Sequence, residues 1–249
     1  MTPMHHLPLE YYVDRLRIGN YFSFAGYSDA EWFSILHFRL GSTTGLGQVL
    51  DGPTGDKLLD ILKRRQNDPR FLVAVPGCLW ERECFLNIQT GTNINAILAE
   101  NNIQLEFYER DMITDDLAAE AGLYPLIHQL QEMKVAIIGN PHLRRLDFLN
   151  YDRFFEVGFP NFHLEVGGIK RVVAEVSTYG CSAVYLVSAG ISAALIIDQL
   201  HDTVQDSFLI DCGSIWDAFV GIGGQRKWRS DLYNNPQKLE EWIRRNLGQ

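Results

Sequence analysis

Cysteine is scarce in this sequence, and its spacing does not suit the common metal-binding motifs. The 249 residues include 4 cysteines, none of them in a C-x-x-C pair, and 7 histidines without H-x-x-x-H or H-E-x-x-H spacing. A zinc site built from these residues is therefore not expected. Three of the cysteines lie beside apolar segments, where reduced and buried thiols are the usual finding. The cysteines are Cys78, Cys84, Cys181 and Cys212.

Long apolar runs are also missing. No stretch approaches the roughly 18–20 residues that cross a bilayer, so no membrane span is expected. Residues 1–8 carry two histidines but no apolar region like that of a signal peptide. We therefore expect a cytoplasmic protein.

An excess of basic residues is absent too. The formal net charge is −9, which argues against a protein that coats nucleic acid, although a local basic groove stays open. A hydrophobic content of 46% with 21% charged residues fits a folded globular chain. Internal repeats, low-complexity tracts and linker-like segments are missing, so we expect one domain over residues 1–249. An oligomer stays open.

What the sequence does contain is an alternation of apolar runs with helical patterns. The expected strands are residues 21–25, 71–75, 135–138, 183–187 and 207–210, with two weaker ones at 104–108 and 154–157. The expected helices are residues 55–65, 115–133 with an interruption near Pro125, 169–179 and 191–200. This order predicts a doubly wound α/β fold, with a mostly parallel sheet and helices on both faces. Ligands of such sheets bind beyond the carboxyl ends of the strands, which makes the residues after each run the site candidates.

The loop after the first strand contains two carboxylates, Asp29 and Glu31. Ser28-x-x-Glu31 also has the pattern of a capping box, in which Glu31 binds backbone N–H groups at the start of a helix. Asp29 can project from the same helix N-terminus. Both interpretations of Glu31, as a helix cap and as a site residue, stay open.

The loop after the fourth strand is a turn of small residues, with Ser188, Gly190 and Ser192. Small residues let a ligand approach the backbone, and the helix that follows presents unpaired N–H groups to an anion. The pattern suits a diphosphate or a ribose. Close packing of the helix on the sheet explains the small residues equally well.

The loop after the fifth strand adds Asp211 and Asp217, so four carboxylates are expected at one edge of the sheet. Carboxylates about 5 Å apart repel by roughly 3 kcal/mol at an effective dielectric constant near 20, and a cation must offset this. Oxygen ligands suit Mg²⁺ or Mn²⁺, which can bridge a nucleotide diphosphate and stabilise it as a leaving group. A turn or capping role for Asp211 and a solvated surface role for Asp217 stay open.

Basic residues follow in the glycine-rich segment 221–229. Arg226, Lys227 and Arg229 can meet phosphate, and Trp228 can stack on a base or a sugar. We expect a lid that closes over a bound nucleotide, with a solvated basic loop as the alternative. Arg144-Arg145, after the third strand, is a second candidate phosphate contact.

Taken together, these segments resemble the GT-D-type glycosyltransferases, which have a Rossmann-like fold. That family carries Ser-Phe-x-Arg-Phe-Gly-Asp-Gly-Glu early in the chain, and residues 23–31 here read Ser-Phe-Ala-Gly-Tyr-Ser-Asp-Ala-Glu. The resemblance implies sugar-nucleotide and metal binding for Asp29 and Glu31. Segments 187–192 and 210–213 are similar to the late turn and the Asp-x-Gly strand end of the family, and 159–161 is more loosely similar to a nucleotide-binding stretch.

Two departures from the family pattern concern the donor. Gly26 stands where the motif has arginine, and Ile191 stands where the late turn has proline. Loss of the arginine removes a partner for phosphate or carboxylate. We therefore expect donor binding to depend on Arg226, Lys227 or Arg229.

The sequence thus predicts a metal-assisted glycosyltransferase that uses a nucleoside diphosphate sugar, with a uridine nucleotide favoured. Asp29 and Glu31 would position Mn²⁺ or Mg²⁺ and the donor, Asp211 would contact the ribose or the metal, and Asp217 would be the general base. The acceptor stays open among a glycan, a glycoprotein and modified phage DNA. Two alternatives stay open as well, a different nucleotide- or cofactor-dependent transferase and a non-catalytic nucleotide-binding module.

Overall fold

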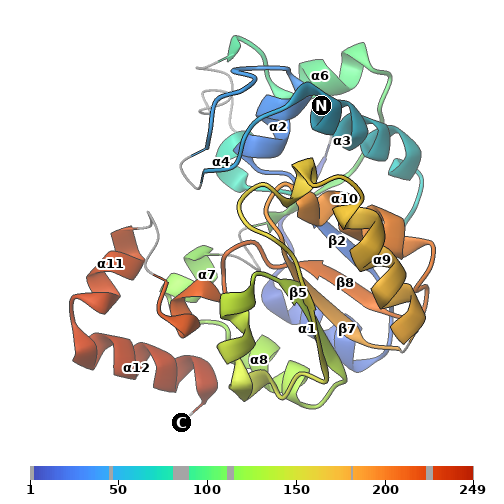
Figure 1. Ribbon diagram of the computed structural model, residues 1–249. Helices are drawn as coiled ribbons and strands as arrows, with labels where there is room; N and C mark the ends of the chain where they lie inside the picture. Colours follow the sequence, from blue (N-terminus) through green and yellow to red (C-terminus); the bar gives the residue numbers. More distant parts are fainter. Residues whose placement is uncertain are drawn as a thin grey trace.

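The computed structural model describes residues 3–44, 47–80, 90–110, 115–180, 182–222 and 227–248. An eight-stranded sheet in the order β1-β4-β3-β2-β8-β7-β5-β6 runs through it, and all the strand pairs are parallel. Figure 1 labels the central strands β2, β8, β7 and β5. The strands are β1 (Met4–His5), β2 (Ser23–Gly26), β3 (Phe71–Val75), β4 (Phe107–Glu109), β5 (Val135–Gly139), β6 (Arg153–Glu156), β7 (Val184–Ser188) and β8 (Phe208–Asp211).

Helices connect these strands and follow the last of them. The α-helices are α1 (Leu9–Arg17), α2 (Asp29–Ile35), α3 (Gly52–Arg65), α4 (Gly77–Trp80), α6 (Ile94–Glu100), α7 (Asp115–Ala119), α8 (Tyr124–Gln131), α9 (Gly168–Tyr179), α10 (Ser192–His201), α11 (Lys227–Tyr233) and α12 (Pro236–Leu247). Short 3₁₀ helices are η2 (Pro141–Arg145), η3 (Asp147–Leu149), η4 (Phe162–Leu164) and η5 (Asp217–Val220). Within the described ranges, no helix combines the length and the apolar content that a membrane crossing requires.

Successive strand residues alternate between two hydrophobic cores. In β3, Phe71, Val73 and Val75 join one core, whereas Leu72 and Ala74 join the other. The first core lies between the sheet and α2, α3, α9 and α10, and the second lies between the sheet and α1, α8 and α12 (Figure 1). Because both faces are covered, the strands are continuously apolar rather than alternately polar. The predicted α/β fold with helices on both faces is confirmed.

The helices that follow β2 and β8 lie on opposite faces of the sheet, although the two strands are neighbours. β2 leads into α2 and α3, which pack on the first core, and β8 leads into η5 and α12, which pack on the second. The chain therefore changes direction between these strands. In open α/β sheets this switch point, at the carboxyl ends of the strands, is where ligands bind.

Most of the expected elements are present with small shifts in their bounds. The strand expected at 71–75 is β3, and the helix expected at 55–65 is α3, which begins at Gly52 because Asp51 caps it through a 3.0 Å bond from Thr54 N. The weaker strands are β4 and β6, and the interruption near Pro125 separates α7 from α8. The elements that were not predicted from the sequence are β1, α1, α4, α6, α11 and α12.

Helices α2 and α3 cross so closely that the crossing tolerates no side chain at Gly55. A Cβ atom there would lie 1.9 Å from the backbone oxygen of Ser34, which cannot rotate away. We expect Gly55→Ala to lower the free energy of unfolding by about 3 kcal/mol, as overpacking of a rigid contact does. Urea denaturation measures this loss.

Gly52→Ala is the matched control, because Gly52 lies in the same helix and its Cβ would make ordinary contacts, with the His37 ring at 3.5 Å and Leu40 Cδ1 at 3.6 Å. This change should leave stability within about 0.5 kcal/mol. Equal effects of the two substitutions would show that close helix packing is not the reason for Gly55.

Candidate active site

The carboxyl ends of β2, β4 and β8 bring together a buried cluster around Arg110. Asp211, at the end of β8, accepts hydrogen bonds from Gly26 N at 3.1 Å and from Gly213 N at 2.8 Å. The guanidinium of Arg110, one residue beyond β4, lies 3.3 Å from the same carboxylate through Nη2 and donates through Nη1 to the Ser28 hydroxyl. The cluster is therefore assembled from three strands at the switch point.

Glu31 belongs to the same cluster and also caps α2. Its Oε2 accepts a hydrogen bond from Ser28 N at 2.8 Å, and Ser28 and Glu31 form a capping box. Burial raises the pKa of Glu31 from 4.5 to about 7, against the opposing effect of Arg110, and Asp211 raises it further. Burial raises the pKa of Asp211 as well, again opposed by Arg110. The capping interpretation of Glu31 is thus confirmed, without removing Glu31 from the site.

Gly26 provides the space that the guanidinium fills. A Cβ atom on Gly26 would lie 2.4 Å from Asp211 Oδ2 and 2.5 Å from Arg110 Nε. Arg110, one residue beyond β4, thus fills the space that a side chain at position 26 would take. Sequence analysis missed Arg110, although it follows the weak strand expected at 104–108 and the rule of examining post-strand residues applies to it.

Asp29 is the first residue of α2 and its side chain is exposed. Glu31, two residues later, is 7% exposed. Residues at this spacing point to different sides of a helix, which places Asp29 toward solvent and Glu31 toward the cluster. The role predicted for Asp29 in donor and metal binding stays a prediction.

The expected convergence of four carboxylates is only partly present. Glu31 and Asp211 share the cluster, but among the described residues no group of three or more His, Cys, Asp or Glu side chains could hold a metal ion. The positive charge that must offset the buried carboxylates is supplied by Arg110. The residues present fit a divalent ion only if the donor's diphosphate supplies most of its ligands, with Asp29 and Glu31 as the carboxylates.

Asp217 lies in a second network, at the start of η5. Its Oδ1 is 3.2 Å from Nε2 of His142, which follows β5, and its Oδ2 is 3.4 Å from Nη1 of Arg229. Arg229 is 2% exposed and also donates to the Ser214 hydroxyl at 2.8 Å. Asp217 is therefore not a solvated surface acid, and its assignment as general base stays a prediction.

The turn after β7 places several buried polar atoms together. Gly190 has a φ of +55°, which other residues rarely adopt. The hydroxyl groups of Ser188 and Ser192 are buried and have no hydrogen-bond partner among the described residues, and the same holds for Nε2 of Gln48. Close packing alone does not explain such groups, because an unpaired buried donor costs about 1–3 kcal/mol.

The predicted lid is only partly described. Arg226 lies outside the described residues, and Lys227 is exposed at the first residue of α11. Arg229 is buried in the network of Asp217, and the Trp228 ring packs 5.9 Å from the Trp242 ring. The expectation that Arg229 is a mobile lid cation is wrong, because its guanidinium is anchored in the protein. The phosphate roles of Arg226 and Lys227 stay predictions.

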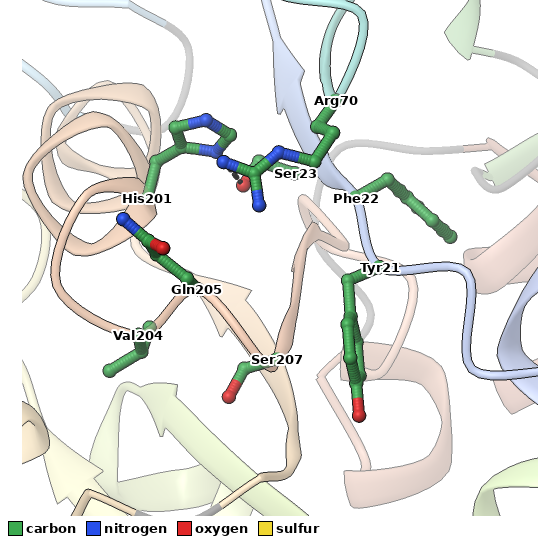
Figure 2. Close-up of a pocket in the computed structure, with 8 residues that line it drawn as sticks. All are labelled: Tyr21, Phe22, Ser23, Arg70, His201, Val204, Gln205 and Ser207. Carbon is green, nitrogen blue, oxygen red and sulfur yellow. Dashed lines mark hydrogen bonds between the residues drawn. The ribbon is translucent and has the colours of Figure 1, made fainter.

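A Ser–His–Asp chain lies at the opposite end of the strands, near the amino ends of β2, β3 and β8. Figure 2 shows its Ser23 and His201. His201 Nδ1 is 2.7 Å from Ser23 Oγ, and His201 Nε2 is 2.8 Å from Asp68. Burial lowers the pKa of His201, although Asp68 opposes this. The adjoining cavity holds about 10 Å³, and Ser23 is 2% exposed. There is room for about one water and not for a substrate, so this chain connects α10 to the sheet.

Cys212 fits the expectation of a structural thiol. It is a buried free cysteine, and burial raises its pKa to about 12. The thiol is therefore protonated and unreactive at neutral pH. Cys84 and Cys181 lie outside the described residues.

Comparison with known proteins establishes the class of fold. No protein-family model matches this sequence, and no match to a curated protein was found. The fold, in contrast, is similar to that of solved proteins, some of which are described as glycosyltransferases or as having a glycosyltransferase fold. The predicted Rossmann-like fold of the GT-D type is thereby confirmed.

These proteins contain the domain of unknown function 1792. One, described as a new glycosyltransferase from Streptococcus sanguinis, has a TM-score of 0.60 and 16% identity, over 91% of this chain and 87% of that chain. Another is described as a highly conserved domain with a distinct glycosyltransferase fold, and it has a TM-score of 0.58 and 13% identity, over 86% and 79%. A third structure, a selenomethionine-substituted domain of unknown function 1792, has a TM-score of 0.59 and 14% identity, over 86% of this chain and 79% of that chain. At these identities the likeness is one of fold.

Proposed function

We propose that this protein is a glycosyltransferase that moves a sugar from a nucleoside diphosphate sugar, with uridine as the base, to an acceptor hydroxyl. The observation that supports this most is the Arg110 cluster. It holds a guanidinium, with a side chain 14% exposed, at the switch point of a sheet with the fold of glycosyltransferases. A guanidinium presents paired N–H donors that suit phosphate oxygens.

In this proposal Arg110 binds the diphosphate and stabilises the negative charge that grows on it as it leaves. Asp211 positions Arg110 for the donor and does not contact the donor itself. Its carboxylate oxygens already accept hydrogen bonds from Gly26 N, Gly213 N and the guanidinium. Ser188, Gly190 and Ser192 face the ribose or the diphosphate. Lys227 is proposed to add a phosphate contact, and so is Arg226, which lies outside the described residues.

Asp29 and Glu31 are the residues that would hold Mn²⁺ or Mg²⁺. When bound, the ion would neutralise diphosphate charge. Asp29 offers an exposed carboxylate for this, and Glu31 a buried one whose Oε2 already caps α2.

The acceptor hydroxyl needs a base. Asp217 acts here together with His142, because a carboxylate 3.2 Å from the ring nitrogen orients the ring and stabilises the imidazolium. The acceptor oxygen bonds to the anomeric carbon, the bond from that carbon to the diphosphate oxygen breaks, and the hydroxyl proton passes to the His142–Asp217 pair. Glycan and glycoprotein acceptors are favoured over modified DNA, because the net charge of −9 repels a polyanion.

Isothermal titration with UDP-glucose, with and without Mn²⁺, tests this function. The double variant Asp29→Asn, Glu31→Gln should weaken Mn²⁺-dependent binding at least about tenfold, which corresponds to about 1.4 kcal/mol. Glu240→Gln with Glu241→Gln, two exposed acids on α12, is the matched control and should bind as the unchanged protein does. Unweakened binding by the Asp29 and Glu31 variant would contradict the site, and no binding by the unchanged protein would contradict the donor class.

A further inference from the structure

The segment around Gln48 lies against the turn after β7, far from it in sequence. A Cβ atom on Gly190 would lie 1.7 Å from Gln48 Nε2 and 2.8 Å from Gln48 Cδ, so the carboxamide covers the Cα of Gly190. Gln48 is 4% exposed. Its side chain is therefore part of the carboxyl edge of the sheet, next to the end of β8.

The backbone on both sides of Gln48 is held in place by the turn at η4. Val49 N donates to Asn161 Oδ1 at 2.8 Å, Asn161 Nδ2 donates to Gly47 O at 3.4 Å, and His163 Nε2 lies 2.9 Å from Val49 O. Gln48 N donates to Thr44 Oγ1 at 3.2 Å. The position of the carboxamide is thus set by the fold.

Nothing in the described part of the chain satisfies this carboxamide nitrogen. Gln48 Nε2, Ser188 Oγ and Ser192 Oγ are all buried and all lack a hydrogen-bond partner there. They come from two segments of the chain, the one around Gln48 and the turn that holds both serines on either side of Gly190. Three unpaired buried groups at one turn are costly to the free protein, and a ligand that pairs with them removes the cost.

The chemistry of the three groups indicates what that ligand presents. Two hydroxyls, which donate and accept, and one amide, which donates, suit neighbouring hydroxyl groups. The end of β7 lies next to the end of β8, where Asp211 holds Arg110, at a strand spacing of about 4.8 Å. A donor with its diphosphate on Arg110 would place hydroxyls of its ribose or of its transferred sugar at this turn.

We infer that Gln48, with Ser188 and Ser192, forms a binding subsite for the vicinal hydroxyls of the sugar nucleotide. Gln48 is the residue of the subsite that sequence analysis did not identify. The inference rests on the proposed function, because it needs a sugar-nucleotide donor at this edge.

Gln48→Met tests the subsite, since methionine keeps the length and shape of the side chain and removes the donor. Binding of UDP-glucose, UDP and 2′-deoxy-UDP is measured by isothermal titration, and stability without ligand by urea denaturation. We expect affinity for UDP-glucose to fall about two- to tenfold and stability to stay equal or rise. The matched control is Gln199→Met, an exposed position on α10.

The three ligands identify which hydroxyls are bound. If the ribose is bound, UDP and UDP-glucose weaken equally and 2′-deoxy-UDP is insensitive to the substitution. If the transferred sugar is bound, UDP-glucose weakens and UDP does not. Both results support the subsite.

Equal affinity of the variant and the unchanged protein for UDP-glucose would overturn the inference and leave the proposed function intact. A loss of stability without ligand that accompanies the loss of affinity would also overturn it, because Gln48 would then be a structural residue. If the unchanged protein bound neither UDP nor UDP-glucose, the proposed function would fail and the inference with it. Gln48→Leu repeats the test with a second apolar side chain.

Discussion

Arg110→Met should destabilise the protein by about 3 kcal/mol near pH 8, and much less near pH 5. Removal of the guanidinium leaves Glu31 and Asp211 as buried carboxylates, both of whose pKa values Arg110 lowers against the effect of burial. Without it these pKa values rise further. The folded variant then binds protons more tightly than the unfolded chain, so its free energy of unfolding falls as the pH rises.

Urea denaturation at the two pH values measures this effect. Adding Glu31→Gln to Arg110→Met should recover part of the loss near pH 8, because one of the unpaired carboxylates is gone. Arg17→Met is the control, since Arg17 pairs with Asp14 on an exposed surface and its loss should cost less than about 1 kcal/mol at either pH. A loss that is the same at both pH values would show that Arg110 acts through packing alone.

Glu31→Gln in the otherwise unchanged protein should raise stability near pH 8 and lower donor binding. The folded pKa of about 7 lies above the ordinary value of 4.5, so ionised Glu31 destabilises the fold. The difference between these two pKa values corresponds to at most about 3 kcal/mol of stability. The folded pKa already includes the attraction between Glu31 and Arg110. Glutamine keeps an oxygen for Ser28 N and thus keeps the helix cap.

The gain in stability should disappear toward pH 4, because Glu31 is then largely protonated in both the folded and the unfolded protein. It should develop as the pH rises from 4.5 to about 7. Thermal and urea unfolding across this range test it, with Glu240→Gln on the exposed face of α12 as the control. A variant that gains stability and loses UDP-glucose binding identifies Glu31 as a site residue kept at a cost to the fold. A variant that neither gains stability nor loses UDP-glucose binding would make Glu31 a helix cap and nothing more.

The local pattern of the chain predicts the sheet better than it predicts the site. The strands at 71–75 and 135–138 are readable because each is a short apolar run that ends on a turn. Helices α1 and α12 were missed, although Leu9, Tyr12, Val13 and Leu16 recur with helical spacing on the buried face of α1.

The pairing of Arg110 with Asp211, in contrast, cannot be predicted from the local sequence pattern. It depends on β2 lying between β3 and β8 and on β4 lying beyond β3, an order that no local pattern records. The post-strand rule brings Asp29, Glu31 and Asp211 to one edge, but it does not show which oxygens are already occupied. Gln48 illustrates the same limit, because it reaches Gly190 from a segment between two helices through contacts with Asn161 and His163.

The absence of a side chain at Gly26 has a consequence for the evolution of such chains. The small volume beside Asp211 that a side chain at position 26 would enter is filled here by Arg110. The two positions should therefore covary among related sequences, with arginine at one and a smaller or uncharged residue at the other. A sequence search that requires arginine in the early motif would discard chains like this one, whereas a search for either arrangement would retain them.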